Sequence, residues 1–312
     1  MTTRTRAADV PPGVPGTLSR SGGLAGWLVA VVQTARPRQW PKNLLVFAAP
    51  LAGATMGRDE GLGYTLIAAV AFVAASAAVY YVNDVLDADR DRQHPVKRLR
   101  AVASGRLPAA HALVLAGLAA ALALASGPVV GELTLTVIIA AYLALSLLYG
   151  LVLKHIPVIE LIFVATGFVF RALGGAVAAQ VPPSAWFLLV CSLGALMVAI
   201  AKRFGELTLL GRNQAARHRP VMRFYRPAWL RRAQWLVTAA MVVAYLLWAV
   251  GQDDPWIRGW HLVSAIPLAA ALIRFERLTK RADGRPVEDL IARDPMMITF
   301  EVAWLVTFAA GL

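Results

Sequence analysis

Cysteine is almost absent from this chain, and charged residues are few. Cys191 is the single cysteine among 312 residues, which excludes an intrachain disulfide, and a lone thiol is more often a small core hydrophobe than a nucleophile. Charged residues make up 16% of the chain and hydrophobic residues 58%, with a mean hydropathy of +0.61. This composition excludes a soluble domain with a large core and indicates an integral membrane protein.

Acidic residues are the scarcer charged class. The chain has 18 Asp and Glu against 31 Lys and Arg, a net charge of +13. Such a surplus can indicate nucleic-acid binding, but here the basic residues are concentrated in the loops between apolar runs. Nucleic acid is therefore not an expected partner, and the membrane is.

Apolar runs of about 20 residues, the length that crosses a bilayer, dominate the sequence. We expect about nine transmembrane helices, near residues 39–57, 62–83, 108–128, 131–153, 157–178, 183–202, 232–251, 258–274 and 295–312. Residues 1–21 are polar and rich in proline and glycine, and we expect them to be disordered. The predicted fold is an all-α integral membrane protein, a single transmembrane domain over residues 22–312 behind a disordered tail.

A shorter apolar run, Gly22 to Val32, precedes the first span. Arg36 and Arg38 follow this run, where a signal peptide would have a small-residue cleavage site, so we reject a signal peptide. We expect an interfacial helix instead, with Trp27 and Trp40 at the level of the lipid headgroups.

Basic residues also predict the orientation in the membrane. Only Arg58 and Arg258 of the 31 Lys and Arg lie in the loops on the second side of the predicted bundle. The positive-inside rule then puts the N-terminus and all charged motifs in the cytoplasm, in a cell inner (plasma) membrane, with the C-terminus outside.

An aspartate-rich segment follows directly on 22 uncharged residues, Leu62 to Asn83. On a helix it forms a polar stripe about 100° wide, with Asp89 on the opposite side. The stripe holds Asn83, Asp84, Asp87 and Asp91. Neighbouring carboxylates repel unless a cation lies among them, and oxygen ligands suit Mg²⁺ or Mn²⁺ bridged to substrate phosphates. The alternative is a solvated loop of mixed charge, although a carboxylate cluster at the end of an apolar span is costly. We predict that these four residues bind the metal and that the three aspartates are catalytic.

Basic side chains near the stripe could donate hydrogen bonds to phosphate oxygens. The candidates are Lys42, Lys97, Arg98, Arg100 and Lys154. For Lys42 and Lys154 the alternative is an ordinary anchor that extends its ammonium group to the membrane surface.

Two further basic sites lie on spans five and six. Arg171 is about 20 Å inside span five, so it must face water, pair with an acid such as Glu160 or Glu301, or bind an anionic headgroup. Span six ends in a charged motif that contains Lys202, Arg203 and Glu206. The loop beyond is rich in arginine, and we expect it to be attracted to anionic lipid.

These motifs together resemble those of the UbiA superfamily of intramembrane prenyltransferases. The NDxxDxxxD motif at Asn83 to Asp91 is followed by HPxKR and ASG, and RPxQWxKN opens the first span. The resemblance covers nearly everything from Ala35 onward. It implies a UbiA-type bundle of nine transmembrane helices with cytoplasmic active-site loops.

One motif of the superfamily is missing. Ring-prenylating members carry a second aspartate motif, DxxxD, after span six, where this chain has KRFGEL. In this respect the chain is similar to the actinobacterial branch of decaprenyl-phosphate phosphoribosyltransferases, which share RPRQWxKN, KHxxxxE, RAxxG and KRxxEL. Here these motifs are Arg36–Asn43, Lys154–Glu160, Arg171–Gly174 and Lys202–Leu207. Two features depart from that branch, a basic tract before Glu288 and the arginine-rich loop after span six.

The resemblance implies a Mg²⁺-dependent transfer of 5-phosphoribosyl from phosphoribosyl pyrophosphate (PRPP) to a polyprenyl phosphate such as decaprenyl phosphate. Pyrophosphate is released, and the product leads to decaprenylphosphoryl arabinose for cell-wall arabinan. The implied PRPP-binding residues are Lys42, Asn83, Lys97, Arg98, Arg100 and Lys154. The implied acceptor-phosphate-binding residues are Arg171, Lys202, Arg203 and Glu206.

Two other functions remain open at this point. One is prenyl transfer from a polyprenyl diphosphate to an aromatic acceptor on the same fold. The other is a transporter or lipid-scrambling protein, which predicts ionisable residues through the membrane midplane, whereas nearly all here lie at one face. A homo-oligomer also remains open.

Overall fold

Helices make up all the regular structure in the computed structural model, which describes residues 23–53, 61–280 and 293–312. The prediction of an all-α protein is confirmed for these ranges. The predicted disordered tail, the loop that contains Arg58 and the tract before Glu288 lie outside them.

Seven helical segments in the described ranges are long and apolar enough to cross a membrane. They are α3 (Gly61–Leu86), the pair α5 (Ala109–Leu124) and α6 (Ser126–Val130), α7 (Leu133–Leu151), α8 (Ile159–Ala178), α9 (Ala185–His218), α10 (Pro227–Val250) and α11 (Pro255–Lys280). Each coincides with one predicted span. The chain is therefore a multi-pass membrane protein.

The first and last predicted spans differ from expectation. Residues 39–57 were expected to form one helix, but Pro37–Phe47 is a 3₁₀ helix, η1, followed by the short α2 (Ala48–Ala52). Prolines in this stretch lack the N–H group that an α-helix requires. The last helix, α13 (Pro295–Ala309), spans about 22 Å, less than the roughly 30 Å hydrocarbon core. Nine full spans are therefore not confirmed among the described residues.

Helix α9 extends well beyond its predicted end at residue 202. It continues to His218, with a break in helical geometry at Gly211, where φ is +71°. The extension carries the KRFGEL motif and the first arginines of the following loop away from the apolar part of the helix.

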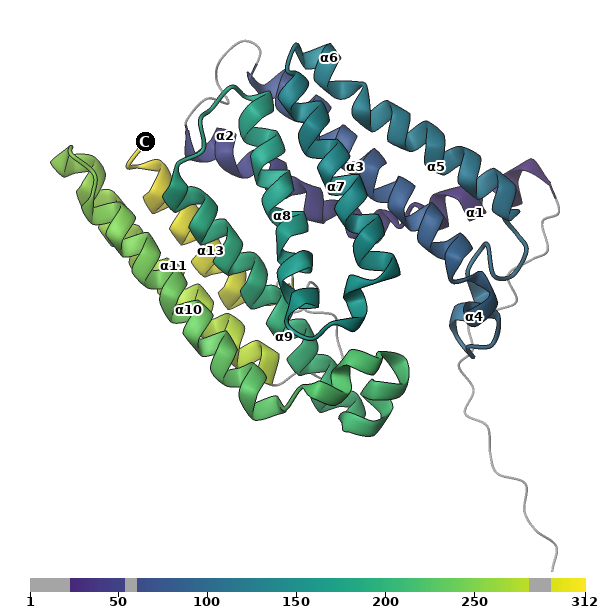
Figure 1. The fold of residues 1–312 in the computed structure, drawn as a ribbon. Helices are drawn as coiled ribbons and strands as arrows, with labels where there is room; N and C mark the ends of the chain where they lie inside the picture. The colour runs from purple at the N-terminus through teal and green to yellow at the C-terminus, as the bar shows by residue number, and fades with distance from the viewer. Residues whose placement is uncertain (1–22, 54–60, 281–292) are drawn as a thin grey trace, which may run out of the picture.

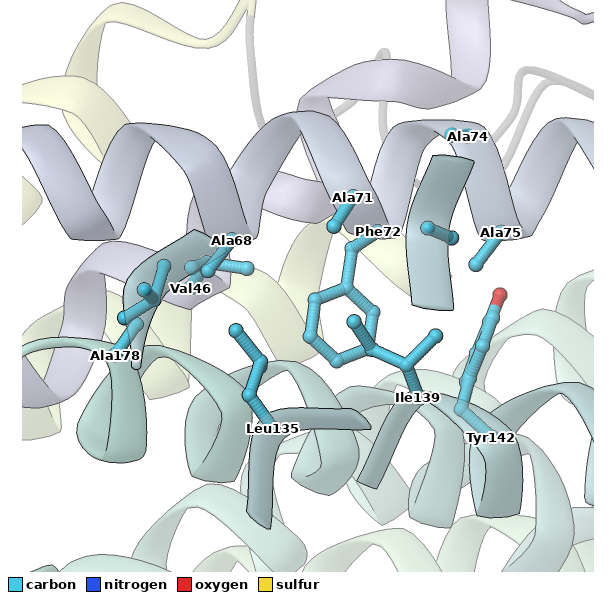
Figure 2. Close-up of a cluster of buried hydrophobic side chains, with 12 residues drawn as sticks. Val46, Ala68, Ala71, Phe72, Ala74, Ala75, Leu135, Ile139, Tyr142 and Ala178 are labelled. Carbon is cyan, nitrogen blue, oxygen red and sulfur yellow. The ribbon is translucent and has the colours of Figure 1, made fainter. Parts of the chain in front are cut away.

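The core around α3 is built from small and aromatic side chains (Figure 2). Phe72 of α3 lies among alanines of the same helix and packs against Leu135 and Ile139 of α7. A Cβ on Gly175 of α8 would collide with the Val46 carbonyl, so η1 lies directly against α8. Small residues permit this close approach of helix backbones within a membrane.

Helix α1 (Leu24–Thr34) corresponds to the predicted interfacial helix. The Tyr81 hydroxyl of α3 donates to the Val31 carbonyl at 2.9 Å, and Ala30 packs in a cluster with Leu107. The segment before η1 is thereby fixed against the end of α3 that carries the aspartates.

The charged segments gather at one end of the bundle. Figure 1 shows α4 (Ala88–Arg92), the connection between α7 and α8, and the C-terminal part of α9 at the lower end, whereas the α8–α9 and α10–α11 connections lie at the other. This arrangement agrees with the grouping of loops on which the cytoplasmic orientation was predicted.

Candidate active site

The aspartate stripe continues the helical spacing of α3 into α4. The Asp87 N–H donates to the Asn83 carbonyl at 2.9 Å, and the Asp91 N–H donates to the Asp87 carbonyl at 2.8 Å. Asp84 and Asp91 are 4% and 3% exposed, whereas the Asp89 side chain is 92% exposed and pairs with Arg92. The predicted geometry of the stripe is therefore confirmed, including the outward direction of Asp89.

Two arginines neutralise the buried carboxylates. Arg36 Nη2 lies 2.5 Å from Asp84 Oδ1, and Arg100 Nη1 lies 2.8 Å from Asp91 Oδ2 and 3.5 Å from Asp84 Oδ1. A buried carboxylate without a cationic partner would be strongly destabilising. Arg100 was predicted at this site from sequence. Arg36 was not predicted there. It is the first residue of the RPxQWxKN motif, and its place in that motif is the sequence signal that could have indicated it.

The donor set fits a hard divalent cation. Every candidate ligand in the stripe is an oxygen, and a single guanidinium nitrogen of Arg100 faces both Asp84 and Asp91, so these carboxylates share one cationic position. Within the described ranges no three acidic, His or Cys side chains converge on one point. Mg²⁺ commonly uses one or two carboxylates and takes its remaining oxygens from substrate phosphates and water, which this arrangement allows.

Lys154 of η3 (Leu153–His155) approaches the stripe, and Gly150 of α7 lies beside Asn83 of α3. Lys154 Nζ lies 3.9 Å from Asp87 Oδ1, which Arg90 also approaches at 3.7 Å. A Cβ on Gly150 would lie 2.7 Å from Asn83 Oδ1, so the absence of a side chain at Gly150 makes room for the amide. The structure thus brings Asn83, Lys154 and the aspartates together, as predicted.

The remaining predicted PRPP-binding residues lie less close to the carboxylates. Lys97 and Arg98 belong to the short η2 (Lys97–Leu99), where the Lys97 backbone N–H donates to His94 Nδ1 and the Arg98 side chain is exposed. The Lys42 ammonium donates to the Gln39 amide oxygen within η1. In the described part of the chain, no ion pair joins Lys97 or Arg98 to the stripe.

A second charged cluster surrounds Glu160, which is fully buried. Arg203 donates to both of its oxygens, at 2.6 and 2.9 Å, and Arg219 donates at 3.1 Å. Tyr149 and Tyr225 add hydroxyl hydrogen bonds of 3.4 Å each. Glu160 therefore ties α7, α8, α9 and the following loop together at one end of the bundle.

The predicted acceptor motif is part of this cluster. Arg203 Nη1 lies 3.1 Å from Glu206, so the guanidinium of Arg203 faces two carboxylates. Lys202 precedes it on α9. Sequence reasoning had not assigned Glu160 and Arg219 to any such network, because residues 59 positions apart give no periodic signal.

Arg171 has partners other than those expected. The predicted pairing with Glu160 or Glu301 is wrong, because Arg203 and Arg219 occupy Glu160. Arg171 instead donates to neutral acceptors on four elements, namely Asn43 Oδ1 at 2.7 Å, the Gly167 carbonyl at 2.6 Å, Ser76 Oγ at 2.9 Å and the Tyr142 hydroxyl at 2.9 Å. Arg171 lies eleven positions, about 16 Å, along α8 from Glu160, so it is not brought together with Lys202 and Arg203.

The family can be stated from comparison of the whole chain. Residues 44–290 match the model of the UbiA prenyltransferase family. The chain belongs to this family. The resemblance read from the motifs is thereby confirmed.

Curated relatives and solved structures agree with membership of the UbiA family. The chain is 37% identical to "Decaprenyl-phosphate phosphoribosyltransferase" of Mycolicibacterium smegmatis, over 90% of this chain and 92% of that one. It is 36% identical to the protein of the same name from Mycobacterium tuberculosis, over 92% and 96%. A UbiA homolog from Archaeoglobus fulgidus bound to DMAPP and Mg²⁺ has the same fold, with a TM-score of 0.69 and 16% identity over 90% of this chain and 97% of that one.

The KRFGEL motif on α9 differs in charge from the second aspartate motif of ring-prenylating members. A second aspartate motif would place carboxylates for a second cation here, but KRFGEL supplies Lys202 and Arg203 against a single Glu206. The charge of Arg203 is neutralised by the buried Glu160. The acidic chemistry of the site is therefore concentrated on the α3–α4 stripe.

Proposed function

We propose that this chain transfers the 5-phosphoribosyl group of PRPP to decaprenyl phosphate and releases pyrophosphate. The observation that carries the proposal is identity of 36–37% to decaprenyl-phosphate phosphoribosyltransferases across at least 90% of this chain and of theirs. The site geometry supports it, because one carboxylate stripe lies among cations suited to a diphosphate.

The donor site is the stripe and its surrounding cations. Asp84, Asp87, Asp91 and Asn83 are the proposed metal ligands, and Mg²⁺, or Mn²⁺ in its place, would offset negative charge on the pyrophosphate leaving group. The structural relative from A. fulgidus, which was solved with Mg²⁺, supports use of a divalent ion on this fold.

The cations at the stripe bind and orient the diphosphate. Arg36, Arg100 and Lys154 lie within 4 Å of the carboxylates, so each side chain needs only a small movement to donate to a phosphate oxygen. Lys97 and Arg98 form an outer set on η2, and Lys42 on η1 is a further cation proposed for the donor. They attract the donor electrostatically before it reaches the stripe.

The reaction exchanges one oxygen for another at the anomeric carbon of ribose. The bond from that carbon to the diphosphate oxygen breaks and the electron pair leaves with pyrophosphate, while an oxygen of the lipid phosphate forms the new bond. A phosphate monoester is already anionic near pH 7, so the acceptor needs no general base.

The acceptor phosphate is proposed to bind near the end of α9. Lys202, Arg203 and Glu206 supply charge there, and Glu160 fixes the direction of the Arg203 guanidinium. Arg171 is left out of this acceptor site, because it lies about 16 Å along α8 from Glu160 and donates to neutral acceptors such as the Tyr142 hydroxyl. The polyprenyl chain would lie against the apolar helix faces.

The proposed cellular setting follows from these substrates. The active site and N-terminus lie on the cytoplasmic side of the inner membrane. PRPP is dissolved in the cytoplasm, and the lipid acceptor is embedded in the membrane. The product supplies decaprenylphosphoryl arabinose for cell-wall arabinan.

Membranes that contain this protein provide the test. They are incubated with Mg²⁺ and either labelled PRPP with decaprenyl phosphate, or labelled prenyl diphosphate with an aromatic acid, and the lipid is extracted. Label from PRPP should enter the lipid phase and should be lost with Asp87→Asn. Transfer from the prenyl diphosphate alone would favour the second candidate, ring prenylation, for which the DMAPP-bound relative is the supporting observation.

A further inference from the structure

The turn between η3 and α8 has a backbone conformation that valine rarely adopts. Val158 has φ +65° and ψ −49°, and the Ile159 N–H donates to the Pro157 carbonyl at 2.7 Å, which closes a γ-turn of the positive-φ kind. This turn is strained for a residue with a Cβ, and more so for a β-branched one. Such strain persists only where surrounding contacts hold it.

The contact that holds this turn comes from a distant segment. The Val158 N–H donates to the Tyr225 hydroxyl at 2.9 Å across 67 residues of sequence. The same hydroxyl donates to Glu160 Oε1 at 3.4 Å, and the Tyr225 ring is buried and stacked on Trp229. Tyr225 directly follows η4 (Pro220–Phe224), so the loop after α9 fixes the chain on both sides of Ile159.

The strained turn lies close in sequence to a donor-site cation. Lys154 is four positions before Val158, and its ammonium group lies 3.9 Å from Asp87 Oδ1. A γ-turn redirects the chain within three residues, so the direction in which η3 extends from α8 depends on the Val158 backbone.

We propose that Tyr225 is a positioning residue, whose hydroxyl holds the Pro157–Ile159 turn and thereby keeps Lys154 at the aspartate stripe. That Lys154 binds the diphosphate part of the donor at this position rests on the proposed function. Loss of the hydroxyl relaxes Val158 toward an unstrained conformation and moves Lys154 away from Asp87. The effect falls on PRPP and leaves use of the lipid phosphate intact.

Tyr225→Phe tests this role against a matched control. Tyr149 also donates to Glu160 at 3.4 Å, but in the described residues its hydroxyl bonds Glu160 and Arg219 rather than the turn. We expect Tyr225→Phe to raise KM for PRPP about five- to tenfold, the scale of one hydrogen bond, with KM for decaprenyl phosphate within about twofold of wild type. Tyr149→Phe should leave KM for PRPP within about twofold of wild type. Equal rises in the two variants would overturn the proposal.

Glycine at position 158 separates strain from a general loss of packing. Glycine adopts positive φ without a steric penalty, so the turn can persist without the Tyr225 hydroxyl. The double variant Val158→Gly/Tyr225→Phe should therefore recover most of the PRPP affinity that Tyr225→Phe loses. A double variant no better than Tyr225→Phe would show that the turn does not connect Tyr225 to the donor site.

A chemical readout distinguishes failure of this inference from failure of the proposed function. The folded protein is labelled with an amine-reactive reagent, and the acylation rate of Lys154 is measured by mass spectrometry of its peptides. The rate at Lys280 is the control for folding. Lys154 should react several-fold faster in Tyr225→Phe than in wild type or Tyr149→Phe, because its contact with Asp87 is lost. An unchanged rate overturns the positioning role. If Lys154 is acylated at the expected rates but the protein does not use PRPP, the positioning role of Tyr225 is upheld and only the proposed function is refuted.

Discussion

Arg36 and Asp84 are 48 residues apart in the chain, and their side chains meet at 2.5 Å between Nη2 and Oδ1. The Arg36 guanidinium also lies 4.6 Å from the centre of the Tyr80 ring, so it is fixed on two sides. Asp84 is buried and shares Arg100 with Asp91. The segment before η1 is thereby joined to the aspartate stripe.

Arg36→Gln should lower kcat/KM for PRPP about ten- to a hundredfold, because a charge-assisted hydrogen bond contributes about 1.5–3 kcal/mol. Arg38→Gln is the matched control, since Arg38 is exposed and lies two positions away. The control should change kcat/KM by less than about threefold. Similar losses in both variants would indicate that general positive charge, rather than the contact with Asp84, is what the site requires.

The aspartates should not be equivalent. Asp84→Asn, Asp87→Asn and Asp91→Asn should each nearly abolish turnover, because they remove charge from the proposed metal ligands. Asp89→Asn should be mild, since that side chain is exposed and pairs with Arg92. Initial rates with labelled PRPP provide the measurement. A loss at Asp89 as large as that at Asp87 would contradict the stripe as the metal site.

Chelation should remove activity, and Mg²⁺ or Mn²⁺ should restore it, because an all-oxygen donor set serves either hard ion. Membranes are treated with EDTA, washed and assayed across a titration of each ion. Zn²⁺ is the contrasting ion, since it prefers nitrogen and sulfur ligands. Full turnover in excess chelator would remove the metal from the reaction.

Much of the site could be predicted from local sequence, and the reason is periodicity. The stripe from Asn83 to Asp91 repeats with the helical period, and seven spans are long apolar runs, so both signals are contained in a short window. The span over 39–57 is not confirmed as one α-helix, because its prolines favour the 3₁₀ helix η1.

Contacts between distant segments could not be predicted in this way. Glu160 meets Arg203 and Arg219 only because α9 packs beside α8. An arginine in a span was expected to need an acid, but Arg171 is satisfied by neutral oxygens converging from several elements, and such convergence depends on the tertiary fold.

Acid should weaken the attachment of α13. The guanidinium of Arg274 beside Asp294 lowers the pKa of that carboxyl, and the Met297 N–H adds to the effect. A lowered pKa means that the stabilisation is present above the unfolded value of about 4 and is lost as pH falls through the folded pKa. Thermal unfolding midpoints of wild type and Asp294→Asn should therefore differ at neutral pH and converge in acid. A constant difference across the range would assign the effect to packing.

The Glu160 cluster provides a test of charge pairing inside the bundle. Arg203→Gln leaves the fully buried Glu160 with Arg219 as its remaining cation among the described residues, and breaking a buried pair costs about 3–5 kcal/mol. Glu160→Gln/Arg203→Gln removes both charges and leaves two amides that can bond each other, so the double variant should unfold at a higher temperature than Arg203→Gln. Arg217→Gln, at an exposed position on the same helix, serves as the control and should have little effect. Thermal unfolding midpoints of Glu160→Gln, Arg203→Gln and the double variant, measured in detergent, report the coupling between the two residues. A double variant whose loss equals the sum of the two single losses would show that the residues stabilise the protein independently.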